Sequence, residues 1–342
     1  MLEVITIENI SLKNSPEVKD LNILITGVAG FIGSNLLEFF LKKDFRVVGI
    51  DNFSTGTESN IDIAIKNASR YRKDLNFTFV KGDIRSYKDC EKVTRKIDVV
   101  FHQAALGSVQ RSLEEPIEVN EVNVCGTMNM LKTSIDNNVK KFIFASSSSV
   151  YGDSEKLPKI EEMPLNPKSI YAATKVASEY YVRLFYRLYG LKTISLRYFN
   201  VFGKRQNPDS IYSAVIPIFL KNLSLNKKLS VFGDGEQGRD FTHIDNVVYA
   251  NLLSMVSQNH KTYGNFYNVA CGEIISLNEM IKFLEKKLNR KIDVFYKNKR
   301  KGDVDKSLAS LKKIREDLGY KPVKKFYRGL VDLIKVLQLG NA

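Results

Sequence analysis

The sequence predicts an α/β fold built on a doubly wound parallel sheet, and three observations support that fold class. From residue 21 onward, short β-branched runs alternate with longer amphipathic segments. The β-branched runs are continuously apolar, which is typical of parallel strands that helices bury on both faces. A glycine-rich turn follows the first run directly. In such a fold we expect a ligand beyond the carboxyl ends of the strands.

The predicted elements follow one another along the chain. The strands are expected at residues 21–26, 45–50, 76–80, 97–102, 141–146 and 192–197, and helices at 31–43, 118–138 and 168–189. After residue 200 the alternation loosens and three prolines, Pro208, Pro217 and Pro322, interrupt it, so we expect a second lobe. The predicted division is an N-terminal extension at 1–20, a sheet domain at 21–200 plus roughly 241–272, and a smaller C-terminal α/β substrate lobe at 201–240 and 273–342.

Composition excludes several classes of protein. With 44% hydrophobic residues, the chain can build a large core. The three cysteines are far apart and form no CxxC, which argues against a disulfide framework or a zinc site and favours a reducing compartment. No apolar run approaches the ~20 residues of a membrane span, and the N-terminus lacks a signal-peptide pattern. We therefore predict a cytoplasmic protein with no membrane partner and no metal.

The net charge of +14 would attract phosphates in general. However, the basic residues are spread along the chain, and the one dense run, YKNKRK at 296–301, is short. We interpret the charge as excess surface lysine and predict no nucleic-acid partner.

The glycine-rich turn predicts a Rossmann-type dinucleotide site. In TGVAGFIGS, Gly27, Gly30 and Gly33 have the spacing GxxGxxG. Glycine permits a tight turn from strand to helix, and the free N–H groups at the helix start can hold a pyrophosphate. The next strand ends at Asp51, about 20 residues after the last glycine, where a carboxylate can bind ribose hydroxyls.

The residues after the second and third strands indicate which dinucleotide binds. Asp51 would repel a 2′-phosphate, and the following NFSTG supplies no arginine to receive one, so NAD is favoured over NADP. In GDIR, Asp83 either hydrogen-bonds the adenine amino group, with Ile84 packed on the ring, or caps its own loop.

The reacting groups are expected after the fifth strand. That strand runs into SSSSVYG (146–152), and in SIYAATK a helix begins that places Tyr171 and Lys175 on one face, one turn apart. Lowering the pKa of a phenol from about 10 to neutrality takes roughly 3 units, or roughly 4 kcal/mol. The Lys175 ammonium and a positive nicotinamide would supply it together. We therefore interpret Tyr171 as a base, Ser147 as its hydrogen-bond partner and Lys175 as the charge that tunes it.

With these residues in place, the sequence resembles an extended short-chain dehydrogenase/reductase and, within that group, the UDP-hexose 4-epimerases. The resemblance covers residues 21–342. It rests on TGVAGFIGSN, DNFSTG, GDIR, FHQAALGSV, SSSSVYGD, YAATK, LRYFNVFG, GRDFTHIDNVV and YNVACGE, in that order.

The resemblance implies a role for each matching position. Ser147, Tyr171 and Lys175 would be catalytic, with Ser148 as the alternative serine for holding the sugar O4. NAD would lie against Gly27, Gly30, Phe31, Ile32, Gly33, Asp51, Asn52, Phe53, Ser54, Thr55, Gly56, Asp83, Ile84, Gln103, Ala104, Ala105, Gly107, Asn123, Tyr171, Lys175 and Phe199. The UDP-sugar would contact Gly107, Ser108, Arg111, Ser147, Ser148, Ser149, Asn200, Gln206, Phe232, Arg239, Arg300, Asp303 and Ser307.

The chemistry that the resemblance implies leaves the cofactor unchanged overall. Tyr171 would remove the proton from the sugar 4-hydroxyl while the C4 hydride moves to NAD, and the 4-keto sugar would turn over and take the hydride back on its other face. Related dehydratases and decarboxylases typically carry a threonine and acidic residues before VYG. SSSSVYG has no carboxylate there, so an epimerase is favoured.

The identity of the sugar is inferred from Ser307. In hexose-specific epimerases this position commonly holds a bulky tyrosine, and a serine leaves room for an N-acetyl group. We therefore expect interconversion of UDP-GlcNAc and UDP-GalNAc, with UDP-glucose/UDP-galactose or a UDP-uronic acid as alternatives, the latter because Arg111 could meet a carboxylate. Ser307 is also a candidate N-cap for a helix at 308–318.

Two further expectations follow. A nucleotide-sugar dehydratase or reductase, or an inactive NAD- and RNA-binding protein, is a rival that the intact Ser147, Tyr171 and Lys175 set disfavours. The helices predicted at 118–138 and 168–189 resemble those through which the family dimerises as a four-helix bundle, so we expect a homodimer.

Overall fold

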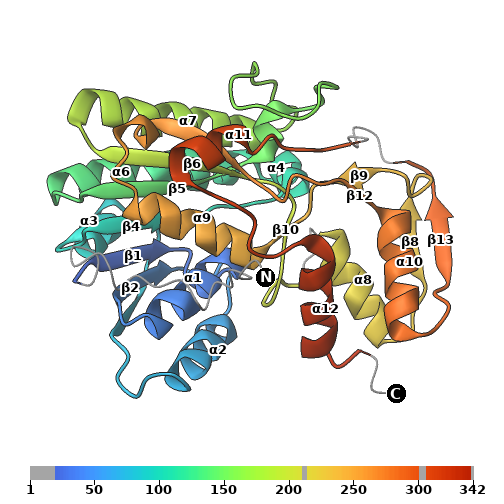
Figure 1. The fold of residues 1–342 in the computed structure, drawn as a ribbon. Coiled ribbons are helices and arrows are strands. Elements are labelled where there is room, and N and C mark those ends of the chain that lie inside the picture. The colour runs from blue at the N-terminus through green and yellow to red at the C-terminus, as the bar shows by residue number, and fades with distance from the viewer. Residues whose placement is uncertain (1–19, 210–213, 300–305, 340–342) are drawn as a thin grey trace.

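A seven-stranded parallel sheet forms the centre of the computed structural model, which describes residues 20–209, 214–299 and 306–339 (Figure 1). The strand order is β11-β6-β5-β4-β1-β2-β3. The strands are β1 (Asn22–Thr26), β2 (Arg46–Asp51), β3 (Phe77–Lys81), β4 (Val99–His102), β5 (Lys141–Ser147), β6 (Lys192–Tyr198) and β11 (Asn265–Val269). The chain order reverses between β1 and β4, and in open α/β sheets ligands bind at such a switch point.

The six predicted strands are confirmed within one or two residues, and the sequence analysis missed β11. That strand pairs with β6 at the edge of the sheet. Its sequence, NFYNV, contains two asparagines, and the Asn268 side chain is fully buried because it hydrogen-bonds within the core. Because β11 buries polar side chains, its sequence lacks the continuous apolar run from which the other strands were predicted.

Helices cover both faces of the sheet. One face carries α1 (Phe31–Lys42), α2 (Glu58–Ser69) and α9 (Ile244–Val256), and the other carries α3 (Tyr87–Thr94), α6 (Gly126–Asp136) and α7 (Ile170–Tyr189) (Figure 1). Each face has its own cluster of buried apolar side chains. The architecture is therefore the doubly wound, Rossmann-type sheet that the sequence predicts.

The helix predicted at 118–138 is three shorter elements rather than one. It comprises α5 (Pro116–Asn120), a π-helix at Glu121–Cys125 and α6, with α4 (Val109–Glu114) before them. Within the π-helix, the Asn123 amide bonds the backbone of Leu106 and the Thr174 hydroxyl. Single π-turns inside helices are often found at functional sites.

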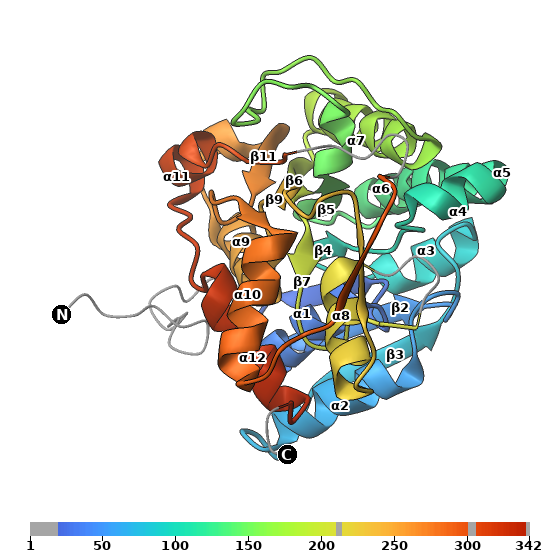
Figure 2. The ribbon, with the colours of Figure 1, turned by 90° about the vertical axis from the view of Figure 1, so that its right-hand side faces the viewer.

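A smaller lobe lies at one end of the sheet and faces the viewer in Figure 2. Its apolar core gathers α8 (Val215–Ser224), α10 (Leu277–Leu288) and α12 (Phe326–Val336) around β8 (Leu229–Phe232). Its sheets are two-stranded: β8 pairs with β13 (Val294–Lys297), β9 (Gly238–Arg239) with β12 (Ile275–Ser276), and β10 (Thr242–His243) with β7 (Val201–Phe202).

The predicted division of the chain into domains stays a prediction, and residues 1–19 lie outside the described residues. One segment packs differently from that division. Helix α11 (Lys312–Leu318) contributes Ile314 and Leu318 to the core of the sheet rather than to the lobe. None of the helices in the described residues is both long and apolar enough to cross a membrane.

Candidate active site

The predicted cofactor residues gather at the carboxyl ends of β1, β2 and β4. Gly27 turns the chain after β1 with φ of +68°, a conformation that glycine adopts without strain. A Cβ on Gly33 would lie 2.1 Å from the Gly27 carbonyl oxygen. Helix α1 can therefore begin this close to the turn only with glycine at position 33. No described side chain caps α1 at Gly30. The N–H groups of its first turn are therefore free to bind the pyrophosphate of a dinucleotide.

Asp51 is held in place at the end of β2. Its two carboxylate oxygens accept hydrogen bonds from the N–H groups of Ala29, at 2.9 Å, and Phe53, at 2.8 Å. Burial raises the pKa of Asp51, and these backbone donors oppose the shift. Each oxygen keeps a further lone pair, so the carboxylate fits two ribose hydroxyls. Phe53 itself has φ of +61°, and the next residues bring Gly56 against Ala29.

Asp83 has partners within the protein. It accepts hydrogen bonds from the Asn52 amide, at 2.9 Å, and from Arg85, at 2.7 Å. The hydrogen bond from Arg85 lowers the pKa of Asp83, so it stays ionised. Asn52 and Asp83, from two neighbouring strands, are thus brought together, and Ile84 beside them is buried.

The segment after β4 is fixed by side chains from other elements. Asn123 accepts from the Leu106 N–H at 2.8 Å, which orients the loop at 103–107. The Gln103 amide donates to Asn251 at 3.3 Å, and Tyr198 donates to the Gln103 carbonyl oxygen at 3.3 Å. Gln103 and Asn123, both predicted to contact NAD, are therefore hydrogen-bonded to other groups of the protein. Ala104 and Ala105 follow Gln103 in the same loop.

The four consecutive serines point in different directions. Ser146 is buried and donates to Glu179 at 2.6 Å, so it faces the core. Ser147 accepts from the Ser149 N–H at 3.1 Å and hydrogen-bonds the Tyr171 phenol. The Ser149 hydroxyl is buried with no hydrogen-bond partner among the described residues. Ser148 begins a short 3-10 helix at Ser148–Tyr151. Of the four serines, Ser147 is the one that contacts Tyr171.

Tyr171 and Lys175 lie on one face of α7, but their pKa values differ from the expectation. Burial raises the pKa of Tyr171, and the Ser147 hydrogen bond opposes it. Burial also lowers the pKa of Lys175 to about 8, which Glu179 opposes. The Lys175 ammonium donates to the Ala145 carbonyl at 2.8 Å. Among the protein's own groups, Lys175 therefore does not lower the phenol pKa, because desolvation dominates both.

Sequence analysis missed a buried polar chain beneath the serines. Glu179 accepts from Arg197 at 2.7 and 2.8 Å, and both side chains are 1% exposed. Arg197 also donates to the Tyr151 hydroxyl at 2.9 Å, which in turn donates to Asn268 at 2.7 Å. Glu179 stands one turn after Lys175, and that spacing was the signal available in the sequence.

A cavity of about 300 Å³ lies in the small lobe, beside the segment that follows β6. It contains three of the residues predicted to hold UDP, Asn200, Phe232 and Arg239. The Gln237 carbonyl oxygen in its wall is buried and without a hydrogen-bond partner among the described residues. Arg300 and Asp303, also predicted for UDP, lie outside the described residues.

Several other predicted residues have partners within the protein and do not line this cavity. Ser108 caps α4 by accepting from the Arg111 N–H at 3.1 Å, and Arg111 forms an ion pair with Glu115 at 3.3 Å. The Gln206 amide donates to Val201 at 3.2 Å. Phe199 is fully buried, next to Asn200.

Ser307 is not the N-cap that the sequence analysis considered. Helix α11 begins at Lys312 with Leu311 as its N-cap, so the helix predicted at 308–318 is shorter. Instead, the Ser307 N–H donates to the Gly238 carbonyl at 3.1 Å, which ties it to β9. Gly238 directly precedes Arg239, which lines the cavity, whereas Ser307 itself is not one of the described lining residues.

Comparison with known proteins agrees with this geometry. The sequence profile of the NAD dependent epimerase/dehydratase family matches residues 23–270. A UDP-N-acetylglucosamine 4-epimerase from Methanobrevibacter ruminantium, solved with UDP-N-acetylmuramic acid, is 37% identical, with TM-score 0.85 over 93% of this chain and 98% of that one. A UDP-glucose 4-epimerase from Thermotoga maritima, solved with UDP-glucose, is 34% identical, with TM-score 0.85 over 93% and 99%. A UDP-glucuronic acid 4-epimerase from Bacillus cereus, solved with UDP-glucuronic acid and NAD, is 30% identical, with TM-score 0.83 over 93% and 99%.

Proposed function

Because the chain belongs to the NAD-dependent epimerase/dehydratase family, and is an NAD-dependent UDP-sugar 4-epimerase, we propose that its substrates are UDP-GlcNAc and UDP-GalNAc. The relatives that resemble it act on N-acetylated, plain and uronic sugars, so the choice among these rests on the chain's own residues. The observation that carries the proposal is the hydrogen bond from Ser307 to Gly238, the residue before the cavity-lining Arg239.

Small residues leave space where the sugar would lie. Ser307 is attached to β9 next to Arg239, and a tyrosine there would take up room beside the cavity. A Cβ on Gly107 would meet no atom within 4 Å, so that side of the site is open as well. Arg111, the candidate partner for a uronate, already pairs with Glu115. These features favour the acetamido sugar over the uronic acid.

We assign the proton transfer to Tyr171. Its phenol contacts Ser147, and it would take the proton from the sugar 4-hydroxyl and later return it to the same oxygen. Ser147 would orient that oxygen. When bound, oxidised NAD would supply an acceptor for the hydride that leaves C4 of the sugar, and a positive charge beside the phenol. Lys175, anchored on Ala145, would hold the nicotinamide ribose.

The decisive experiment follows the anomeric protons by NMR without added reductant. The purified protein is incubated separately with UDP-GlcNAc, UDP-glucose and UDP-glucuronic acid. We expect conversion of UDP-GlcNAc to UDP-GalNAc and slower or no conversion of the others. The Ser307→Tyr variant should lose activity on UDP-GlcNAc and keep NAD. Conversion of only the plain or only the uronic sugar by the unmodified protein would overturn the assignment of the substrate.

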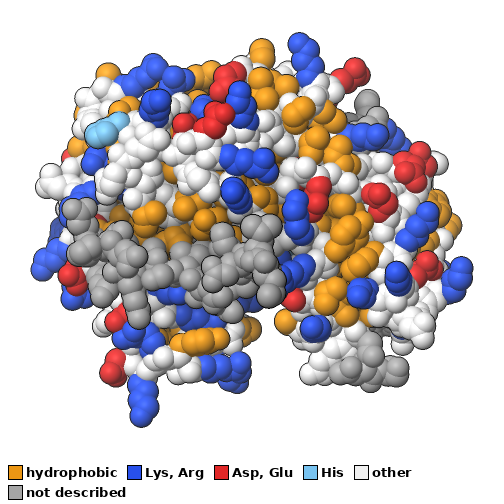
Figure 3. All heavy atoms as spheres, viewed as in Figure 1, with side chains coloured by type: hydrophobic (Ala, Val, Ile, Leu, Met, Phe, Trp, Pro, Cys, Tyr) orange, Lys and Arg blue, Asp and Glu red, His pale blue; other side chains and the backbone are white. Residues whose placement is uncertain are grey.

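We also propose that two copies pair through α5 and α7. These helices contact each other and expose large apolar side chains, among them Ile117 (75% exposed), Leu188 (68%) and Tyr180 (57%). Exposed apolar patches of this kind mark interaction surfaces. Light scattering should give twice the chain mass, and Leu188→Glu should give single chains; a monomeric parent protein would refute the pairing. On the face in Figure 3, lysine and arginine side chains are scattered over the surface, with acidic side chains between them.

A further inference from the structure

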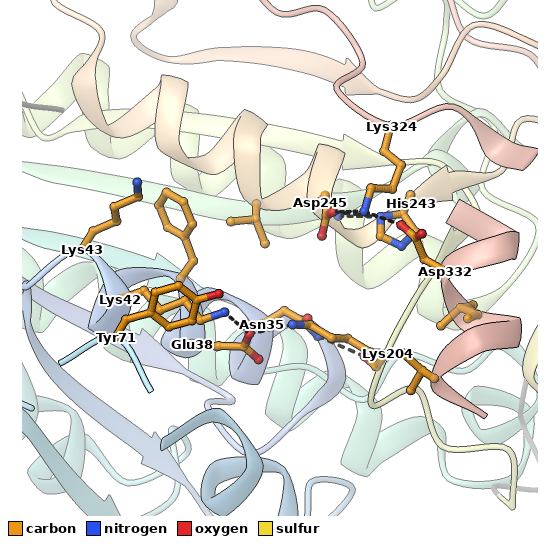
Figure 4. Close-up of a pocket in the computed structure, with 14 residues that line it drawn as sticks. Asn35, Glu38, Lys42, Lys43, Tyr71, Lys204, His243, Asp245, Lys324 and Asp332 are labelled. Carbon is orange, nitrogen blue, oxygen red and sulfur yellow. Dashed lines mark hydrogen bonds and ion pairs between the residues drawn. The ribbon is translucent and has the colours of Figure 1, made fainter. Parts of the chain in front are cut away.

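A buried carboxylate on the cofactor helix gathers three cations. Glu38 of α1 is 3% exposed. It accepts hydrogen bonds from Lys42 at 2.8 Å, Lys204 at 2.7 Å and Arg205 at 2.5 Å. Figure 4 shows Glu38 beside Asn35 and Lys204, in a cavity that also has α12 in its wall. We call Glu38, Lys204 and Arg205 the Glu38 clamp.

The clamp requires a charged carboxylate. Burial alone would raise the pKa of Glu38, but Lys204, Lys42 and Arg205 outweigh it and hold the pKa far below its usual range. An ionised group in such a place is stable only while its partners remain, and removing one side leaves the other charge buried without compensation.

The clamp holds a strained backbone. Arg205 has φ of +67°, a left-handed conformation that is unfavourable for a residue with a long side chain. Its side chain is only 4% exposed and donates to Ser34 at 3.0 Å as well as to Glu38. The Asn35 amide adds a bond to the Lys204 carbonyl at 3.1 Å. Such strain persists only where surrounding contacts enforce it, and it is often found at functional sites.

The clamped segment joins the two halves of the molecule. It follows β7, whose residues line the 300 Å³ cavity next to Asn200. Gln206 comes directly after Arg205 and bonds back to Val201. The chain then continues into α8 of the small lobe. The same helix α1 presents its N-terminus to the cofactor, so the clamp connects the cofactor's helix to the wall of the cavity.

From this arrangement we propose that Glu38 is a positioning residue of the epimerase, which sets the place of the UDP-sugar relative to NAD by fixing the loop at 203–206 on α1. The inference rests on the proposed function, because it takes the 300 Å³ cavity as the UDP site. Glu38 does not line that cavity, so it would act on the UDP-sugar only through Arg205 and Lys204.

The test uses the full chain and four variants. Glu38→Gln removes the charge, and Arg205→Ala removes the clamp while leaving a side chain that resists the left-handed conformation. Arg205→Gly removes the clamp but adopts that conformation without strain. Lys42→Met is the matched control, because it deletes an ion pair to the same carboxylate without touching the loop. The measurements are the Kd for UDP by calorimetry, KM and kcat for the sugar that the parent converts, bound NAD, and Tm.

We expect Glu38→Gln and Arg205→Ala to weaken UDP binding and raise KM by about tenfold to a hundredfold, the range for small misplacements far from the chemistry. NAD should stay bound. Arg205→Gly should be affected less than Arg205→Ala, and Lys42→Met should bind UDP as the parent does. A fall in Tm with unchanged UDP binding and KM, or an equal loss in Lys42→Met, would overturn the inference. If the parent converts no UDP-sugar, the function fails, but the UDP affinities of the variants still decide on the clamp.

Discussion

The carboxyl edge of the sheet and the small lobe are stabilised by different contacts. At the edge, Glu179, Arg197 and Tyr151 satisfy one another's buried polar groups. In the lobe, the buried contacts are apolar, mostly between aliphatic side chains, with an aromatic group in which Phe326 packs on Phe202 and Phe241, ring centroids 5.4 Å apart in both pairs. The lobe's sheets have two strands each, whereas the central sheet has seven.

The difference shows which region fixes the orientation of its side chains more tightly. Polar groups that are fully paired fix the orientation of neighbouring side chains, and here they lie directly behind the serines and Lys175. Apolar packing in the lobe constrains its parts less specifically. Under the proposed function, the residues assigned to the chemistry therefore lie on the fully paired region, and Ser307, assigned to the choice of sugar, is hydrogen-bonded to β9 of the lobe.

The largest expected effect tests the edge itself. Tyr171→Phe keeps the ring and removes only the proton-transferring hydroxyl, so turnover should fall roughly 10²–10⁴-fold. Bound NAD and Tm should stay close to those of the parent. Turnover by NMR together with the NAD content of the purified protein checks this, and retained turnover would remove Tyr171 from the assigned role.

The second effect concerns the buried ion pair behind the edge. Glu179→Gln leaves the Arg197 charge uncompensated, and breaking such a pair costs about 3–5 kcal/mol of unfolding free energy. The matched control is Lys140→Met, which breaks an exposed pair with Asp98 and should cost about 0–1 kcal/mol. Urea unfolding of both variants measures the difference. Equal losses would show that the edge is no more rigid than the surface.

The smallest effect compares two buried histidines, one from each region. Burial lowers the pKa of His102, in the sheet, to about 3, and that of His243, beside the lobe, to about 4. Both stay neutral in the folded protein, whereas the unfolded chain binds protons below about pH 6.5. Each histidine therefore stabilises the fold above pH 6.5, and that stability is lost as the pH falls toward 4 and 3. The expected slope is about 1.4 kcal/mol per pH unit for each proton.

The variant His102→Gln separates the contribution of His102 to the pH dependence from that of His243. It keeps hydrogen-bonding groups for Thr26 and Thr127, which contact the imidazole at 2.8 and 3.0 Å. Urea unfolding at several pH values between about 7.5 and 5 gives the free energy of unfolding as a function of pH. The slope of this plot should be smaller in the variant than in the parent, by the contribution of about one proton. An unchanged slope would mean that His102 titrates normally in the folded protein.

The sequence by itself determined the parallel sheet, six of its strands and the glycine turn, because these depend on the local pattern of apolar residues and on backbone freedom near Gly27 and Gly33. It also determined NAD as the cofactor, through Asp51. Only the tertiary structure decided which serine meets Tyr171, that Ser307 hydrogen-bonds to β9 rather than capping a helix, and that Glu38 reaches Arg205. The physical reason is that a buried polar group takes its partner from residues distant in the chain, and desolvation then sets its pKa. Neither is encoded in the neighbouring residues.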